Sequence, residues 1–397
     1  MSTLRMVRQD NASLTVGDMA ESSDEPGLTV VIPCLNERIT IAEAVMQAQL
    51  AFANWPDGVE VIVADNGSTD DSAELARAMG ARVVAALERG YGVALQAGFA
   101  AARTAYIVYA DADLTYDFSE GPRLVTALRD SKADMVVGTR LQGHIEPGAM
   151  PGLHRYLGTP ILTAMINLLF GSKLTDCNSG FRAFRRDRLT AWHVSAPGME
   201  FASELLVNAL RAGATIVEVP ITLRRDQRHR HPHLQTWRDG MRHLLTILAR
   251  APWLFLHGGL AIVVLSLLIA TMCAFGPRLV FARFTIFDYH TLIFAVLLGF
   301  LGTQVFGTGL LLQLRGPRPI TGLAAKLLDL HEGVLFWLLA GIAAGVVGGV
   351  GFVAWSWVQH GFANIAYLKF TLFLLYTATV VGSFGMSLFY AHLLKRT

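Results

Sequence analysis

Four long apolar segments toward the C-terminal end constrain the fold of this chain more than any other feature of its sequence. They cover residues 253–275, 289–314, 334–358 and 368–392, and each is long enough to cross a hydrocarbon core of about 30 Å. Four such runs in succession, almost free of charge, favour membrane spans over buried helices of a soluble protein. The composition agrees, because 53% of the residues are hydrophobic and 16% are charged, whereas soluble domains average about 45–50% and about 25%.

Charged residues around these segments predict their orientation. Lys and Arg gather before the first segment, between the second and third, and at the C-terminus, while residues 359–367 contain neither. Because cytoplasmic loops carry the excess of positive charge, we expect both chain ends and the large N-terminal part in the cytoplasm. No apolar core follows the early arginines, so no signal peptide is expected. The prediction is a multi-pass protein of the cell (inner) membrane.

The part before the membrane segments is predicted to be an α/β domain. Residues 1–26 are polar and are expected to form a disordered tail. Between residues 27 and 230, apolar β-like runs alternate with stretches of helical length. Continuous Val and Ile runs between helices predict a Rossmann-like, mostly parallel sheet covered on both faces. Ligands of such sheets bind beyond the carboxyl ends of the strands, so the residues after each strand are the candidates for function.

A juxtamembrane helix is predicted at 231–252, before an all-α membrane domain at 253–397. Apolar residues recur there at helical spacing, and they are Leu234, Trp237, Met241, Leu244, Leu245 and Leu248. Arg238, Asp239 and Arg242 lie elsewhere around the helix. This pattern suits a helix in the lipid headgroup layer or a helix packed on the α/β domain. Either arrangement would hold the domain against the membrane.

Charge and cysteine content exclude several classes of protein. The net charge of +2 gives no reason to expect nucleic-acid binding. Three cysteines are too few for a disulfide framework, and none forms a Cys-x-x-Cys pair, which disfavours a structural zinc site.

Two aspartates follow the fourth predicted strand. Asp111 and Asp113 are two residues apart, so on an extended chain their side chains point the same way. Paired carboxylates repel one another unless a cation neutralises them, and a divalent ion that also binds a diphosphate is a suitable partner. A surface turn is one alternative. With Thr115 the segment also fits the haloacid-dehalogenase phosphatases, but their motif opens the domain, whereas this one follows three βα units.

Polar residues also follow the first two strands. Asp65 ends the second strand, and Asn66–Gly67 permits a tight turn. Asp65 could accept hydrogen bonds from a nucleobase or ribose, and Glu37, after the first strand, is placed to meet a nucleotide. An ordinary βα turn is the alternative for either segment.

Together these segments resemble family 2 glycosyltransferases with the GT-A fold. The order and spacing of VVIPCLNE, VIVADNGSTDDS, ERGYGVALQAGF, YADADLTYDF, VVGTR and DCNSGFRAFRR carry the resemblance, which covers residues 28–225. The chain is most similar to polyprenyl-phosphate sugar synthases, the class of dolichyl-phosphate mannose and glucose synthases. The resemblance implies transfer of a hexose from a nucleotide sugar, UDP-glucose or GDP-mannose, to polyprenyl phosphate, with Mg²⁺ or Mn²⁺ as cofactor.

The resemblance also assigns site residues. Positions matching nucleotide-sugar contacts are Pro33, Asn36, Glu37, Asp65 and Asp111. Positions matching the metal-binding motif are Asp111 and Asp113. Positions matching the acceptor phosphate region are Arg140, Arg155, Ser179 and Arg182. Asp111, Asp113 and Arg140 are the expected catalytic residues.

The sequence departs from the family pattern at three places. Thr115 stands where many relatives have Gln, which leaves a third metal ligand open. The segment LRRDQRHRHPHL replaces a segment with Arg and Gly-x-Ser-Lys, and Arg224, Arg225 or Arg228 are the candidates to substitute for it. Glu200 and Glu204 lie where other members have an acidic base, so they are candidates for acceptor-side or structural roles.

A lipid phosphate acceptor fits this set of residues. A phosphate monoester is mostly dianionic at neutral pH, so it needs no general base, but it needs cations such as Arg140, Arg155 and Arg182 to offset repulsion from the donor diphosphate. The apolar segment 154–171 is expected to be a helix that lines a lipid entrance, with a plain core helix as the alternative.

Two other functions are alternatives. A processive polysaccharide synthase of the same family would carry Gln-x-x-Arg-Trp, whereas here Gln235, Trp237 and Arg238 stand in another order. A lipid-linked sugar transporter fused to a glycosyltransferase would need ionisable groups within the membrane, and the four segments have them only near their ends. We therefore expect the membrane half to anchor or oligomerise the enzyme, with a separate flippase as a compatible partner.

Overall fold

The computed structural model describes residues 25–56, 58–227, 236–275, 279–281, 284–286, 288–315, 320, 322–330, 332–359 and 368–396. These residues form two compact units that meet in the sequence between Leu248 and Ala249. The expected tail lies outside the described residues up to position 24, and strand β1 begins at Glu25. Arg228, Gln235 and Leu234 also lie outside the described residues.

The first unit is built on a seven-stranded mixed sheet with the order β3-β2-β1-β4-β6-β5-β7. The strands are β1 (Glu25–Cys34), β2 (Val59–Asp65), β3 (Arg82–Ala85), β4 (Thr104–Tyr109), β5 (Met135–Ile145), β6 (Arg182–Arg185) and β7 (Ile216–Leu223). Strand β6 runs antiparallel to β4 and β5, and the other pairs are parallel. The predicted mostly parallel sheet is confirmed.

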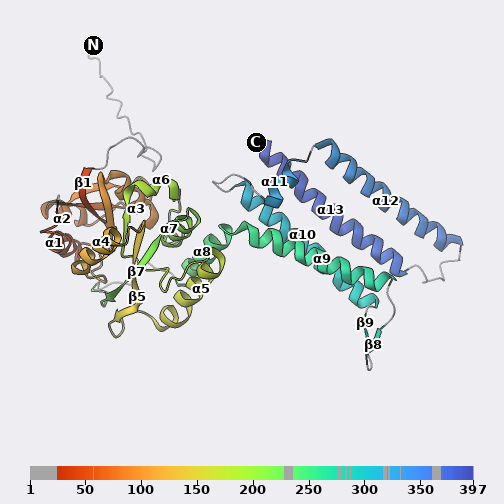
Figure 1. Cartoon of the computed structure of the whole chain (residues 1–397), viewed down its shortest axis with the longest axis horizontal. Coiled ribbons are helices and arrows are strands. Elements are labelled where there is room, and N and C mark those ends of the chain that lie inside the picture. The colour runs from red at the N-terminus through yellow and green to blue at the C-terminus, as the bar shows by residue number, and fades with distance from the viewer. Residues whose placement is uncertain are drawn as a thin grey trace, which may run out of the picture. The chain divides into compact units, whose positions relative to one another are not determined.

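Helices cover both faces of this sheet (Figure 1). They are α1 (Ile41–Ala51), α2 (Ser72–Ala78), α3 (Tyr91–Ala101), α4 (Gly121–Asp130), α5 (Thr159–Phe170), α6 (Leu189–Trp192), α7 (Phe201–Arg211) and α8 (Thr236–Ala249). Because successive side chains of a strand point to opposite faces, Val30 packs in the core beneath α1 and α4, whereas Val31 packs in the core beneath α3, α5 and α7. Burial on both faces explains the continuous apolar runs.

The apolar runs of the sequence do not predict strand β6. It has four residues, Arg182–Arg185, and two of them are arginines. Its two central side chains nevertheless enter opposite cores, Ala183 on one face and Phe184 on the other. A strand this short carries no periodic signal of its own, and its place is set by pairing with β4 and β5.

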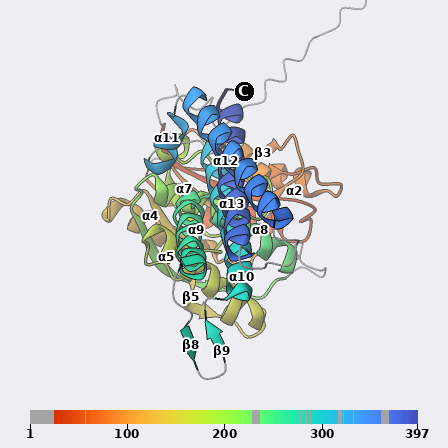
Figure 2. The ribbon, with the colours of Figure 1, turned by 90° about the vertical axis from the view of Figure 1, so that its right-hand side faces the viewer.

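The second unit contains four helices that are long and apolar enough to cross a membrane, as the sequence predicts. They are α9 (Pro252–Phe275), α10 (Tyr289–Leu314), α12 (Glu332–Gln359) and α13 (Leu368–Arg396). The short helix α11 (Gly322–Leu328) and the hairpin β8 (Leu279–Phe281)–β9 (Phe284–Ile286) lie between them in the chain, and Figure 2 shows the two strands of the hairpin side by side. Small residues allow close packing, since a Cβ added at Gly302 of α10 would lie 2.9 Å from the Val263 nitrogen of α9.

Candidate active site

The carboxyl ends of β1, β2 and β4 meet at a pocket of about 860 Å³. Pro33, Glu37, Asn66, Asp111 and Asp113 line it from these strand ends. The start of α3, the loop that includes Pro197–Glu200, and helix α8 supply the other walls. This is the edge of the sheet where the sequence predicts a ligand.

Asp111 is held in the pocket wall by a tyrosine that the sequence analysis did not single out. The Tyr91 hydroxyl, at the first residue of α3, donates a hydrogen bond of 2.9 Å to Asp111 Oδ1. Burial, together with the charge of Asp111, raises the pKa of Tyr91 well above its usual value. The hydroxyl therefore stays protonated and fixes the rotamer of the carboxylate.

Asp113 is held by its own turn. Its Oδ1 atom accepts hydrogen bonds from the Thr115 nitrogen at 3.1 Å and from Thr115 Oγ1 at 2.6 Å. The side chain is 7% exposed and lines the pocket. Thr115, which stands where many relatives have Gln, thus orients the carboxylate of Asp113.

The paired carboxylates fit a divalent cation. Both belong to the same pocket wall, and carboxylate oxygens are the donors that Mg²⁺ and Mn²⁺ prefer. No group of three or more His, Cys, Asp or Glu side chains suited to a metal occurs in the described parts of the chain. Two protein carboxylates with further oxygens from a substrate diphosphate and water are a common arrangement for Mg²⁺, so the donor set suits a metal that arrives with a nucleotide.

The residues expected to contact the nucleotide divide into two groups. Pro33 and Glu37 line the pocket, and Glu37 is 6% exposed. Asn36 and Asp65 are not among the described residues that line the pocket, and both make hydrogen bonds in the neighbouring turns. Asn36 has a φ of 56° and accepts a hydrogen bond of 2.7 Å from the Thr69 nitrogen, while Asp65 accepts one of 3.2 Å from the nitrogen of Ser68. The turns after β1 and β2 are therefore joined through side chains.

Asn66 is a further pocket residue for which the sequence analysis noted only a turn. Its side-chain amide donates to the Glu88 carbonyl at 2.7 Å, and its Oδ1 atom accepts from the Gly90 nitrogen at 2.6 Å. Gly90 has a φ of 151°, and a Cβ there would collide with the Pro197 carbonyl oxygen. The Gly-Tyr-Gly sequence was the available signal, because only glycine permits this approach.

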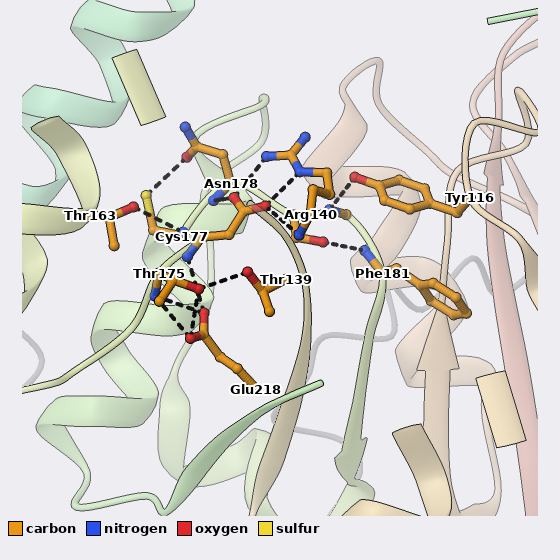
Figure 3. Close-up of polar contacts among 12 residues, drawn as sticks. Tyr116, Thr139, Arg140, Thr163, Thr175, Cys177, Asn178, Phe181 and Glu218 are labelled. Atoms are coloured by element: carbon orange, nitrogen blue, oxygen red, sulfur yellow. Dashed lines mark hydrogen bonds and ion pairs between the residues drawn. The ribbon is translucent and has the colours of Figure 1, made fainter. Parts of the chain in front are cut away.

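Arg140 lies at the end of a buried polar network rather than in open solvent (Figure 3). Its Nε and Nη2 atoms donate to Asp176 Oδ2 and Oδ1 at 2.7 and 2.8 Å. Burial would raise the pKa of Asp176, but the charge of Arg140 and the hydrogen bonds from Arg140 and Asn178 together lower that pKa below its usual value. Glu218 of β7 in turn accepts from the nitrogens of Thr175 and Asp176. The guanidinium of Arg140 is thus oriented by the carboxylate of Asp176, and the Asp176 backbone is in turn held by Glu218.

The loop that carries Asp176 also reaches Asp111. The Gly180 nitrogen donates to the Tyr116 hydroxyl at 2.7 Å, and a Cβ at Gly180 would lie 2.8 Å from Asp111 Oδ2. Burial would lower the pKa of Arg140, but Tyr116 and the Asp176 carboxylate raise it above its usual value, so the guanidinium keeps its charge. Arg140 and the pocket carboxylates therefore share one loop, although Arg140 is not among the described residues that line the pocket.

The other residues expected at the acceptor phosphate lie elsewhere. Arg182 is fully buried, and its guanidinium donates to the carbonyls of Ser179, Ala202 and Cys177. Ser179 is also fully buried. The structure gives these two side chains a place inside the fold, where they hold the loop before β6. Arg155 is half-buried and lies over the Tyr156 ring, with 5.4 Å between the guanidinium carbon and the ring centroid.

The two glutamates considered for acceptor-side roles differ. Glu204 is 1% exposed and accepts from the nitrogens of Ser195 and Ala196 at 2.9 and 2.6 Å, so it supports the loop behind the pocket. Glu200 lines the pocket. Its Oε1 atom accepts from the Gly198 nitrogen at 3.1 Å, and its buried Oε2 atom has no hydrogen-bond partner among the residues that the structure describes.

The arginines after β7 also have partners in the structure. Arg224 pairs with Asp117, and the Arg225 nitrogen donates to Glu146 Oε2 at 3.0 Å. These contacts join the end of β7 to the loops after β4 and β5.

Segment 154–171 forms a π-helical turn followed by α5. One side enters the core through Leu162 and Ile166, and the other leaves Tyr156, Ile161 and Leu168 exposed. Part of the helix is therefore a core helix, and its role in lining a lipid entrance stays a prediction.

Helix α8 closes one side of the pocket. Arg238, Asp239 and Arg242 line it. On another side of the helix, His243 Nδ1 lies 2.7 Å from Ser203 Oγ, and Ile247 is buried in the core. The structure thus has the helix packed on the α/β domain with an apolar stripe left exposed, and its contact with the lipid headgroup layer stays a prediction.

Comparison with known proteins identifies the family. The model described as Glycosyl transferase family 2 matches residues 29–190. The low-salt glycan biosynthesis hexosyltransferase Agl6 of Haloferax volcanii is 36% identical over 87% of this chain and 84% of its own length. The dolichyl-phosphate hexose transferase of the same organism is 32% identical over 50% of this chain and 82% of its own.

A third relative is the undecaprenyl-phosphate 4-deoxy-4-formamido-L-arabinose transferase of Klebsiella pneumoniae, which is 31% identical over 72% of this chain and 86% of its own length. The match to the hexosyltransferase extends over most of both chains, and the family model spans the strands that build the pocket. The chain, with its GT-A-like sheet and its paired carboxylates at the strand ends, is a glycosyltransferase and belongs to glycosyltransferase family 2.

Proposed function

We propose that the protein transfers a hexose from a nucleotide sugar, UDP-glucose or GDP-mannose, to polyprenyl phosphate with inversion at the anomeric carbon. The observation that carries this proposal is the pair Asp111 and Asp113 in the wall of a pocket at the carboxyl ends of β1, β2 and β4. The names of two relatives support a polyprenyl phosphate as the acceptor, since one is a dolichyl-phosphate hexose transferase and the other an undecaprenyl-phosphate sugar transferase. Four long apolar helices suit an enzyme whose substrate stays in the bilayer.

The donor is proposed to bind along the strand ends. Pro33 and Glu37 would contact the nucleoside, and Asn36 and Asp65 would shape the turns around it. Asp111 and Asp113 would hold Mg²⁺ or Mn²⁺ against the diphosphate. When bound, such a cation stabilises the negative charge of the departing nucleoside diphosphate. The Oε2 atom of Glu200, buried beside the pocket, is a suitable acceptor for a hexose hydroxyl.

The acceptor is its own nucleophile. An oxygen of the phosphate monoester attacks the anomeric carbon, the bond from that carbon to the diphosphate oxygen breaks, and the electron pair leaves with the nucleoside diphosphate. The dianionic phosphate carries no proton that must be removed. Arg140 and Arg155 are proposed to offset the repulsion between acceptor and donor, while Ser179 and Arg182 keep the loop between Asp176 and β6 in place.

The proposed location is the cell membrane, with the α/β domain on the cytoplasmic side, where nucleotide sugars are made. The distribution of Lys and Arg supports it. Cysteines placed at position 322 should react with a membrane-impermeant thiol reagent only from the cytoplasmic side, and a cysteine at position 361 only from the outside. Labelling of position 322 from outside would invert the orientation.

A screen of donors tests the proposed function. Purified full-length protein is incubated with undecaprenyl or dolichyl phosphate, a divalent cation, and radiolabelled UDP-glucose, GDP-mannose or other nucleotide sugars. The expected product is a lipid-extractable, acid-labile polyprenyl-phosphate hexose. High-molecular-weight polysaccharide as the labelled product would favour the processive alternative.

A further inference from the structure

Three arginine side chains line the pocket, and two of them come from α8. Arg89 precedes α3, whereas Arg238 and Arg242 stand one turn apart on α8. Arg140, Arg155 and Arg182 do not line this pocket, within the described residues. The arginines that line the pocket together with the strand-end carboxylates therefore include two from a helix whose sequence pattern predicted only a polar side.

The order of residues around α8 is informative. Each residue of an α-helix turns by about 100°, so residues four apart lie within about 40° of one another. Trp237, Met241 and Leu245 form one such row, and they are 81%, 53% and 57% exposed. Arg238 and Arg242 form the adjacent row. The cationic row lies between the exposed apolar row and the side of the helix that carries Asp239 and Thr246 in the pocket wall.

The far side of α8 is fixed to the domain. Ser203 and His243 are joined through their side chains, and Ile247 is fully buried. The helix therefore cannot turn its apolar row toward the core without breaking these contacts. The exposed row and the cationic row keep their order relative to the pocket.

The charges on α8 leave capacity for an anion. Arg238 Nε and Arg242 Nη1 lie 3.9 and 4.0 Å from the same Asp239 oxygen, which is beyond hydrogen-bond distance. The two arginine side chains are 60% and 47% exposed. Two guanidinium groups share one carboxylate, so the trio is net positive. By contrast, the Arg140 fork makes two short hydrogen bonds to Asp176.

We propose that Arg238 and Arg242 bind the phosphate of the lipid acceptor, with its isoprenyl chain along Trp237, Met241 and Leu245. This site is additional to Arg140 and Arg155, and the inference rests on the proposed function. An amphiphile with an anionic head matches adjacent cationic and apolar rows, whereas a water-soluble nucleotide sugar has no apolar chain for the second row. The phosphate then enters the pocket beside α8, where the positive charges of Arg238 and Arg242 offset its repulsion from the donor diphosphate.

Direct binding tests this site without depending on catalysis. Farnesyl phosphate and inorganic phosphate are titrated into purified full-length protein in detergent and followed by calorimetry. We expect Arg238→Gln/Arg242→Gln to weaken farnesyl phosphate binding about tenfold to a hundredfold, as loss of charge-assisted hydrogen bonds predicts. Arg238→Lys/Arg242→Lys should restore part of the affinity. Trp237→Ser should weaken farnesyl phosphate and leave the weak binding of inorganic phosphate unchanged.

Matched controls separate this site from folding and from the donor site. Arg77→Gln removes an exposed arginine of α2 that pairs with Glu74, and it should change neither affinity nor melting temperature. In the transfer assay, the α8 double variant should raise KM for polyprenyl phosphate and leave the Kd of the nucleotide sugar unchanged.

The outcomes distinguish this inference from the proposed function. A wild type that binds farnesyl phosphate through α8 but transfers no hexose to any polyprenyl phosphate supports the site and overturns the function. A wild type that transfers hexose while the α8 double variant keeps its affinity for farnesyl phosphate overturns the site. Loss of nucleotide-sugar binding in the α8 double variant also overturns the site. So does inorganic phosphate that binds the wild type as tightly as farnesyl phosphate does.

Discussion

The hydroxyl of Tyr91 donates a hydrogen bond of 2.9 Å to Oδ1 of Asp111. This contact joins the start of α3 to the residues that follow β4, and the same two elements also pack through Phe99 and Tyr109, whose ring centroids are 5.5 Å apart. Gly92 approaches the first residue of α7 so closely that a Cβ would lie 2.9 Å from Phe201 Cβ. The position of the pocket carboxylate thus depends on a tyrosine and on the backbone around it.

Tyr91→Phe removes only this hydrogen bond and should lower kcat about tenfold to a hundredfold, because a hydrogen bond to a charged group contributes about 1.5–3 kcal/mol. Steady-state transfer kinetics with saturating metal measure the effect. Tyr106→Phe, a control in β4 whose ring packs against the opposite core, should keep wild-type kcat. Equal loss in both variants would mean that the Tyr91 hydroxyl has no special relation to Asp111.

Gly180→Ala should inactivate the enzyme without unfolding it. The new Cβ would lie 2.8 Å from Asp111 Oδ2, so the carboxylate must move out of its place in the pocket wall. Gly240→Ala, where a Cβ meets nothing within 4 Å, is the matched control and should be active. Transfer activity is compared with the melting temperature of each variant. An active Gly180→Ala enzyme would show that Asp111 need not keep this position.

Breaking the Arg140–Asp176 pair should destabilise the α/β domain. The two side chains are 11% and 0% exposed, and removing one partner of a buried pair costs about 3–5 kcal/mol. Asp176→Asn and Arg140→Ala should therefore both lower the denaturant midpoint. Arg185→Ala breaks an exposed pair with Asp187 and should cost about 0–1 kcal/mol. If these variants lose no more unfolding free energy than Arg185→Ala does, the buried pair does not stabilise the domain.

The attachment of α8 should weaken in acid. Burial lowers the pKa of His243 below its usual value, against the raising effects of Glu200 and Asp239. Above about pH 6.5 neither the folded nor the unfolded chain protonates this imidazole. As the pH falls through that value, the unfolded chain takes up a proton that the folded domain does not, so stability is lost.

Unfolding midpoints measured between about pH 8 and about pH 5 test this expectation. The decline on the acid side should be smaller in His243→Asn than in the wild type. His144→Gln changes an exposed histidine and should leave the wild-type profile. If the unfolding midpoints of all three proteins change with pH in the same way, groups other than His243 cause the loss of stability in acid.

The strands that form the pocket could be predicted from the sequence because each is an apolar run buried on both faces, and the polar residues after them had to meet at one edge. Four residues predicted in this way, Pro33, Glu37, Asp111 and Asp113, line the pocket. The four long helices could also be predicted from the sequence, because a membrane span needs a length and an apolar composition that the bilayer sets.

The remaining site residues depend on contacts that no local pattern contains. Arg182 carries the same charge as Arg140, yet its guanidinium is buried and donates to the carbonyls of Cys177 and Ser179 in the preceding loop and of Ala202 in α7. Tyr91 reaches Asp111 only because α3 begins beside the end of β4. The helical pattern of α8 showed an apolar face, but not that its arginines would line the pocket.

Transfer of labelled hexose to polyprenyl phosphate by the wild type, Asp111→Asn and Asp113→Asn tests the central claim most directly. We expect metal-dependent formation of the glycolipid by the wild type, its loss with EDTA, and its recovery with Mg²⁺ or Mn²⁺. Both variants should fold and be nearly inactive, because the strand-end carboxylates hold the cation that neutralises the donor diphosphate. Glycolipid formation within a few-fold of wild type by either variant, in saturating metal, would contradict the account.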